Sequence, residues 1–61
     1  MINNNFPKDP VMLLSVVNTK LRDYYDSLDE FCQAEDVDRD ELIQLLQSID
    51  YTYDAATNRF D

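Results

Sequence analysis

The side chains that could perform chemistry are mainly carboxylates, because the 61-residue chain has 13 Asp and Glu residues, one cysteine and no histidine. Asp26 and Asp29, or Asp38 and Glu41, have the three-residue spacing of neighbours on one helix face, where paired carboxylates can act as acid and base. A domain this small offers little room for a cleft that would shift a carboxyl pKa. The pairs therefore indicate a solvated helix face, and we expect no enzyme.

A calcium site is the second chemistry to consider, because residues 36–40 alternate acidic side chains as the start of an EF-hand loop does. That loop needs glycine at its sixth position and glutamate at its twelfth, where this chain has Glu41 and Gln47. The acids are better explained as helix-start charges that the macrodipole favours. We expect neither a metal nor a cofactor.

Cys32 is the only cysteine, so the chain cannot form an internal disulfide, a zinc site or a catalytic cysteine–histidine pair. Its position in an apolar stripe indicates a small buried side chain. A lone cysteine fits a reducing compartment, and the first residues have no basic and apolar leader. No segment approaches the about 18 apolar residues of a membrane span. These features predict a cytoplasmic protein that does not enter a membrane.

The elements that must position these side chains begin after a polar stretch. Residues 1–8 are interpreted as a flexible N-terminal arm, which either docks through Phe6 or is disordered, and residues 9–61 as a single domain. Asp9 and Pro10 predict a helix start, because Asp can accept from unpaired backbone N–H groups and Pro fits the first helical position. The predicted apolar stripe of this helix comprises Pro10, Leu14, Val17, Leu21, Tyr24 and Leu28, and Leu13 and Val16 widen it.

Two capping boxes predict two further helices. Ser27 with Glu30 indicates that the second helix begins there, and Asp38 with Glu41 indicates the start of the third. The third helix is expected to stop near Asp50, in the left-handed conformation that Asp tolerates. Beyond it, the alternation around Tyr51-Thr52-Tyr53 and the pair Arg59-Phe60 predict a short hairpin, with Asp54 and Asn58 shaping its loop.

The expected fold is mainly α: a tri-helical, helix-turn-helix-like bundle with a short, wing-like C-terminal β-hairpin. The second and third helices fit the motif, with Cys32 at its small position, Asp36 at its turn and Glu35 where an apolar residue is usual. Its buried positions are Leu28, Phe31, Val37, Leu42 and Leu45.

Nucleic-acid binding has to overcome the charge of the chain. The formal net charge is −8, and the face that would meet DNA carries Asp38, Asp40 and Glu41 beside a single Arg39. Phosphate neutralisation by Lys and Arg supplies most non-specific affinity for DNA. Nucleic acid is therefore an unfavoured partner.

The first helix and the tail resemble a known family. The residues that carry this resemblance are Pro7-Lys8-Asp9-Pro10, Leu13-Leu14-Ser15, Val17-Asn18, Lys20-Leu21-Arg22-Asp23, Tyr25, Ser27-Leu28-Asp29, Val37-Asp38, Ile49, Tyr51, Tyr53-Asp54, Asn58 and Phe60. The chain resembles bacterial domain-of-unknown-function family 4250 from Pro7 to near its end. It departs from that pattern at Glu35 and Asp50, where the family has Leu and Gly. The resemblance implies no activity.

The resemblance points to a polar cluster on the first helix, Asn18, Lys20, Arg22 and Asp23, which is either a partner-binding patch or solubilising surface. Tyr24 and Tyr25 are adjacent, so at least one should lie at the surface or against a second subunit. The residues expected to bind a partner are Asn18, Lys20, Arg22, Asp23, Tyr24 and Tyr25.

The hypothesis from sequence is a non-catalytic protein-interaction module whose partner is another protein or a second copy in a homodimer. The alternatives are a DNA-binding winged-helix-like regulator and an acidic inhibitor of a basic partner.

Overall fold

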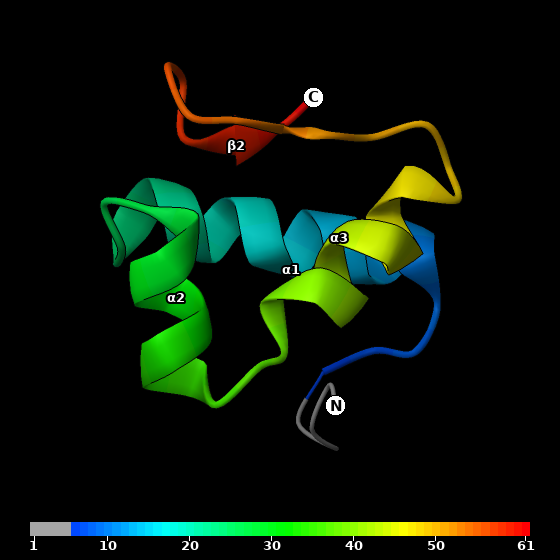
Figure 1. Cartoon of the computed structure of the whole chain (residues 1–61), viewed down its shortest axis with the longest axis horizontal. Helices are drawn as coiled ribbons and strands as arrows, with labels where there is room; N and C mark the ends of the chain where they lie inside the picture. The colour runs from blue at the N-terminus through cyan, green and yellow to red at the C-terminus, as the bar shows by residue number, and fades with distance from the viewer. Residues whose placement is uncertain (1–5) are drawn as a thin grey trace.

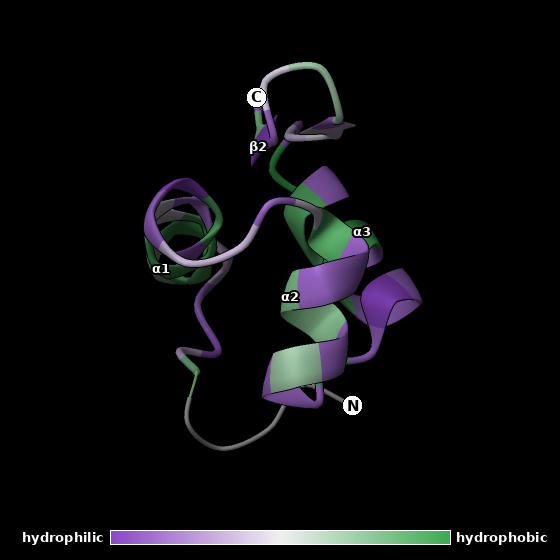
Figure 2. Cartoon of the chain, turned by 90° about the vertical axis from the view of Figure 1, so that its left-hand side faces the viewer, coloured by the Kyte–Doolittle hydropathy of each residue, from purple (hydrophilic) through white to green (hydrophobic). Residues whose placement is uncertain are grey.

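The computed structural model describes residues 6–61 and has three helices followed by a two-stranded antiparallel hairpin (Figure 1). Its elements are α1 (Pro10–Asp23), α2 (Leu28–Glu35), α3 (Arg39–Gln47), β1 (Tyr53–Asp54) and β2 (Arg59–Phe60). Helix α1 contacts α2, α3 and β2. Figure 2, which looks along α1, shows α2 and α3 together on one side of it. The predicted mainly α fold with a C-terminal hairpin is confirmed.

Each helix begins at the residue that the sequence predicts. The side chains of Asp9, Ser27 and Asp38 accept hydrogen bonds from backbone N–H groups in the first turns of α1, α2 and α3. Such a cap stabilises a helix by about 1 kcal/mol. The caps fix where each helix starts in a chain that has no glycine.

Among residues 6–61, three have positive φ angles and lie at the ends or turns of elements, where glycine is usual. They are Asp36 at the end of α2, Asp50 after α3 and Asn58 before β2, with φ of 57°, 68° and 55°. Asp and Asn tolerate this conformation better than most residues. The predicted left-handed positions of Asp50 and Asn58 are confirmed.

The core lies between α1 and the α2–α3 pair and is closed by the hairpin. Its buried side chains are Phe6, Leu13, Val17, Leu21, Leu28, Phe31, Cys32, Val37, Leu42, Leu46 and Phe60. The predicted stripe of α1 was wrong in detail. Leu13 is buried and Leu14 only partly, because residues 13, 17 and 21 are four apart and share one face. Tyr24 is 71% exposed because α1 ends at Asp23.

One expected buried position of the helix-turn-helix pattern also shifts. Leu45 is only partly buried, whereas Leu46 is fully buried beside Leu42 on the same face of α3. The other expected core positions of α2 and α3 are buried, including Cys32. The buried face of the third helix therefore runs through Leu42 and Leu46, which are four residues apart, and Leu45 lies at its edge.

The two ends of the chain pack against this core. Phe6 is 7% exposed and meets Phe31 edge to face, with ring centroids 5.8 Å apart. Residues 1–5 of the expected N-terminal arm lie outside the described residues. In the hairpin, Tyr53 pairs with Phe60, and reciprocal backbone hydrogen bonds join Thr52 to Asp61. Tyr51 lies before the strand rather than in it.

Candidate functional site

The six residues expected to bind a partner do not form one patch. Asn18 and Tyr25 bond other parts of the domain, Lys20 is partly buried beside α2, and the remaining three are exposed. Within residues 6–61 no group of three or more His, Cys, Asp or Glu could hold a metal ion. None of the helices described is long and apolar enough to cross a membrane.

Asn18 joins α1 to the hairpin. Its Nδ2 donates to the carbonyl of Phe60 at 3.0 Å, and the Phe60 N–H donates to its Oδ1 at 2.8 Å. Phe60 is one of the largest fully buried side chains, so these bonds seat the hairpin on the core. Asn18 therefore has a structural role in this domain.

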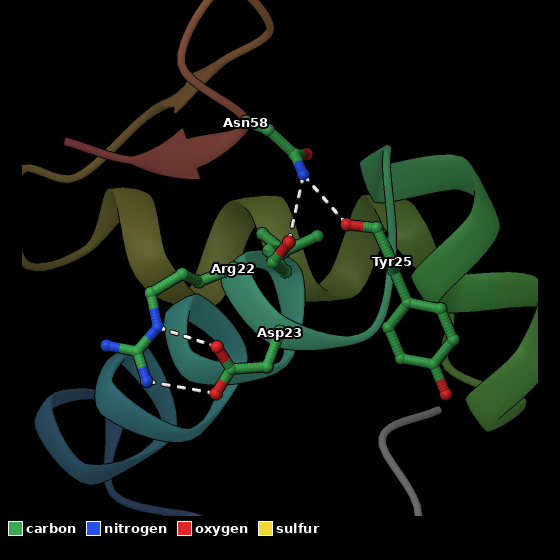
Figure 3. Close-up of polar contacts among 5 residues, drawn as sticks. Arg22, Asp23, Tyr25 and Asn58 are labelled. Atoms are coloured by element: carbon green, nitrogen blue, oxygen red, sulfur yellow. Dashed lines mark hydrogen bonds and ion pairs between the residues drawn. The ribbon is translucent and has the colours of Figure 1, made fainter.

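Asn58 forms a second junction, on the turn before β2 (Figure 3). Its Nδ2 donates to the backbone carbonyls of Leu21 and Tyr25, at 3.0 and 2.9 Å. Its Oδ1 accepts from the Tyr53 hydroxyl at 2.7 Å, and that hydroxyl in turn accepts from the N–H of Leu28 at 3.2 Å. The end of α1, the start of α2 and both strands are thereby tied together.

Tyr25 and Lys20 both contact Glu35 at the end of α2. The Tyr25 hydroxyl donates to Glu35 Oε2, and the Lys20 ammonium lies 3.5 Å from the same oxygen. Hydrogen bonding to the Glu35 carboxylate raises the pKa of Tyr25 above its usual value, with burial adding to the effect. The contacts with Tyr25 and Lys20 explain how a carboxylate is accommodated at position 35, where the helix-turn-helix pattern has an apolar side chain.

Arg22, Asp23 and Tyr24 lie at the surface at the end of α1. The Arg22 guanidinium donates to both carboxylate oxygens of Asp23, at 2.8 and 2.9 Å, and this bond lowers the pKa of Asp23 (Figure 3). The Lys20 ammonium lies 5.8 Å from the centroid of the Tyr24 ring. As predicted, at least one of the two adjacent tyrosines is exposed.

An open groove of about 850 Å³ runs between α1 and the C-terminal segment. Its apolar part is formed by Val11, Leu14 and Tyr51, and its polar part includes Arg22 and Arg59. We call it the α1–hairpin groove. The remaining lining residues are Ser15, Asn18, Thr19, Leu21, Tyr25, Asp26, Thr57 and Asn58.

The negative charge of the chain is concentrated away from this groove. Seven of the 13 acids but only one of the five basic residues lie between residues 28 and 41, in α2, the turn and the start of α3. The Asp38 side chain there accepts from the N–H of Glu41 as the helix cap. The face of α3 that would meet DNA is therefore acidic, and one of its acids caps the helix itself.

Cys32 lies on α2, and its side chain is buried in the core of the domain, where the residue is 7% exposed. Burial raises the pKa of its thiol, so the reactive thiolate is disfavoured at neutral pH. The structure agrees with the interpretation of Cys32 as a small apolar side chain.

In a comparison with known protein families, the chain matches a family described as Domain of unknown function (DUF4250) over residues 7–60. The chain belongs to this family. The DUF4250 match covers all three helices and the hairpin, together with the groove between them. Comparisons with curated proteins and with solved structures found no match.

Sequence reasoning missed the groove and the contacts of Asn58. Asn58 was expected only to adopt positive φ, whereas its side chain also bonds Tyr53 and the backbone of α1. The residues that carry the resemblance to the family include Asn18, Asn58 and Phe60, which was a usable signal. It did not say that the residues contact one another across the DUF4250 fold.

Proposed function

We propose that this protein is a non-catalytic interaction module that works in the cytoplasm and binds a protein partner through the α1–hairpin groove. The observation that carries the proposal is the exposure of apolar side chains along this part of the molecule. Val11 and Tyr51 in the groove are 61% and 37% exposed, and Met12 beside it is 58% exposed. Exposed apolar surface rimmed by polar residues is typical of protein-binding sites.

The chemistry of the groove supports binding rather than catalysis. Its polar lining consists of hydroxyls, amides, two arginines and Asp26. Asn18 and Asn58 are already engaged in the hydrogen bonds that hold the hairpin. The groove therefore offers contact area and two cationic anchors, without an activated nucleophile beside a base.

Site-specific photocrosslinking tests this function. Benzoylphenylalanine is placed at Thr57 in the groove, and in control proteins at Gln44 on α3 or Gln33 on α2, both exposed outside it. In extract of the source cells, we expect one discrete adduct from Thr57 and none from either control. The purified partner should then bind the unmodified protein. Adducts from the control positions alone, or from none, would contradict the proposal.

A second copy of the chain is one partner that the exposed apolar side chains in and just after α1 allow. Val11, Met12 and Tyr24 are each more than half exposed, and a domain this small gains stability by covering such side chains. The charge of −8 on each copy opposes this association. Sedimentation equilibrium at micromolar concentration decides it, because a mass of 7.2 kDa throughout would exclude the homodimer.

The concentration of acids between residues 28 and 41 favours a second function, inhibition of a strongly basic partner. The same crosslinking experiment separates the two. An adduct from Gln33 to a basic protein, dissociated by moderate salt, would favour the inhibitor, whereas a salt-resistant adduct from Thr57 would favour the groove.

A further inference from the structure

We infer that the α1–hairpin groove binds an extended segment of a partner protein that presents an apolar side chain and, three to five residues along, an Asp or Glu side chain. This inference rests on the proposed function and adds the chemistry of the partner. It follows from the two unlike ends of the groove, one apolar and one cationic.

The apolar end is formed by three side chains. Val11 and Leu14 are three apart on α1 and therefore lie on one face, and Tyr51 approaches them from the segment before β1. Tyr51 and Val11 keep substantial exposed surface, while Leu14 packs partly on the core. An aliphatic or aromatic side chain of the partner would cover this surface.

The cationic end is set by the way in which the hairpin is attached. Hydrogen bonds join Asn18 to Phe60, and Asn58 to the last turn of α1, so β2 runs beside the second half of that helix. Arg59 lies between Asn58 and Phe60 in the chain, at the level of the turn that carries Arg22. Both arginines line the groove, so they border the same stretch of it.

The guanidinium groups are available to a carboxylate. Among the described residues, the ion pair of Arg59 is with Asp61, at 3.6 Å, which is longer than a hydrogen bond. Arg22 uses two nitrogens on Asp23, but its side chain is 74% exposed. Exposed ion pairs contribute little stability, so either arginine can add or exchange a carboxylate partner at small cost.

The overall charge of −8 does not prevent an acidic segment from binding here. Most of the excess acid lies between residues 28 and 41, whereas the groove lies between α1 and the hairpin. The molecule measures 24 × 23 × 18 Å, and charges in physiological salt are screened over about 8 Å. Arg22 and Arg59 are the cations that a carboxylate meets inside the groove, and the opposing charges are Asp26 in the lining and the two exposed ion-pair partners, Asp23 and Asp61.

The length of the groove sets the spacing of the two side chains in the partner. A helix rises 1.5 Å per residue, so Val11 and Leu14 lie about 16 and 12 Å along the axis from Arg22. An extended chain advances about 3.3 Å per residue, so these distances correspond to four to five residues of the partner. The spacing falls to about three residues where the arginine side chain extends toward the apolar end of the groove.

Phage display of random dodecapeptides tests the inference. The peptides are fused to the N-terminus of the coat protein, so they have no free C-terminal carboxylate and every carboxylate that binds comes from a side chain. The folded 61-residue protein is the target. We expect enriched peptides to carry Asp or Glu three to five positions from an apolar residue. A synthetic enriched peptide should bind the R22Q and R59Q double variant about tenfold or more weakly than wild type. The control variant R39Q removes the same kind of charge from α3 and should leave the affinity unchanged.

The outcomes separate this inference from the proposed function. Absence of enrichment, enrichment without an acidic residue, or equal affinity for the double variant would overturn the acidic-segment inference. A discrete Thr57 crosslink alongside any of these would keep the interaction function and reject the partner chemistry. Loss of the Thr57 crosslink would reject the function. Circular dichroism and urea unfolding of the double variant establish that its domain is intact.

Discussion

Asn18 and Phe60, 42 residues apart, exchange two hydrogen bonds: the Asn18 carboxamide donates to the Phe60 carbonyl and accepts from the Phe60 N–H. This is the pattern by which a neighbouring strand would bond the outer edge of β2. One side chain of α1 therefore does for the hairpin what a third strand does in a larger sheet. Two-residue strands are marginal alone, and this attachment explains how the hairpin is retained.

Replacement of Asn18 by Ala should destabilise the domain strongly. The change leaves the N–H and carbonyl of Phe60 without partners beside a side chain that is 2% exposed, which we expect to cost about 2–4 kcal/mol. Urea unfolding followed by circular dichroism measures the loss. Thr19→Ala, at the adjacent exposed position, is the control and should change stability by less than about 0.5 kcal/mol. Equal losses in the two variants would mean that the Asn18 bonds are not important.

Glycine should have opposite effects at two of the positive-φ positions. Asp36→Gly relieves the left-handed backbone at the end of α2 and removes a negative charge from the end of the helix where the macrodipole disfavours it. We expect a gain of about 0.5–1 kcal/mol. Asn58→Gly relieves the same strain but removes the hydrogen bonds to α1 and Tyr53, so it should destabilise.

The measurement for this pair is the midpoint of thermal unfolding under one buffer condition. A rise for Asp36→Gly and a fall for Asn58→Gly are expected. If Asn58→Gly were as stable as wild type, the bonds seen at Asn58 would contribute nothing beyond its backbone conformation.

The Tyr25 hydrogen bond to Glu35 should make the stability of the domain depend on pH in the alkaline range. The pKa of Tyr25 is raised in the folded state, so its contribution to stability is complete below the ordinary tyrosine pKa of about 10. That contribution is lost as the pH rises through the raised folded-state pKa. Tyr25→Phe keeps the ring contact with Phe31 and should have a lower urea midpoint than wild type at neutral pH.

The difference between wild type and Tyr25→Phe should shrink as the pH rises above the ordinary tyrosine pKa of about 10 and through the raised folded-state pKa, because the wild-type phenol then ionises beside a carboxylate. Tyr24→Phe is the matched control. Tyr24 is exposed, so removal of its hydroxyl should leave the urea midpoint unchanged at both neutral and alkaline pH. A constant difference across this pH range would show that the hydroxyl is not coupled to Glu35.

The helix starts were predictable from sequence because capping depends on residues within one turn of each other. Ser27 with Glu30 and Asp38 with Glu41 carry that information locally, and both caps form as expected. The rotation of the helices was less predictable. Leu13 and Leu14 are both apolar, and only packing against the other helices decides which of them is buried.

The groove and its borders were not predictable, because they depend on contacts between distant residues. Asn18 has the same polar character whether it faces solvent, a partner or the backbone of β2. The cluster predicted on α1 therefore mixed a residue that holds the hairpin with Arg22, which borders the groove. Arg59 was counted only as a strand residue, and its place beside α1 required the hairpin attachment.

Duplex DNA should not bind this protein, although its helical order resembles that of winged DNA-binding domains. The recognition position would be α3, whose first turn carries Asp40 and Glu41 after the capping Asp38. Phosphates approaching this face meet three carboxylates and the single Arg39, which is already paired with Asp29 at 2.7 Å. Non-specific affinity for DNA comes from phosphate neutralisation, which this face cannot supply. Specific contacts with bases would therefore have no non-specific binding to add to.

Fluorescence anisotropy with a labelled mixed-sequence duplex at low salt measures this directly, and we expect no change on addition of protein. Low salt is the most favourable condition for electrostatic binding, so a flat titration there excludes weaker binding at physiological salt. Binding that falls steeply with added salt would contradict the expectation and restore the DNA-binding alternative. The surface responsible would then have to be sought around Arg22 and Arg59, since these arginines border the groove away from the acidic helices.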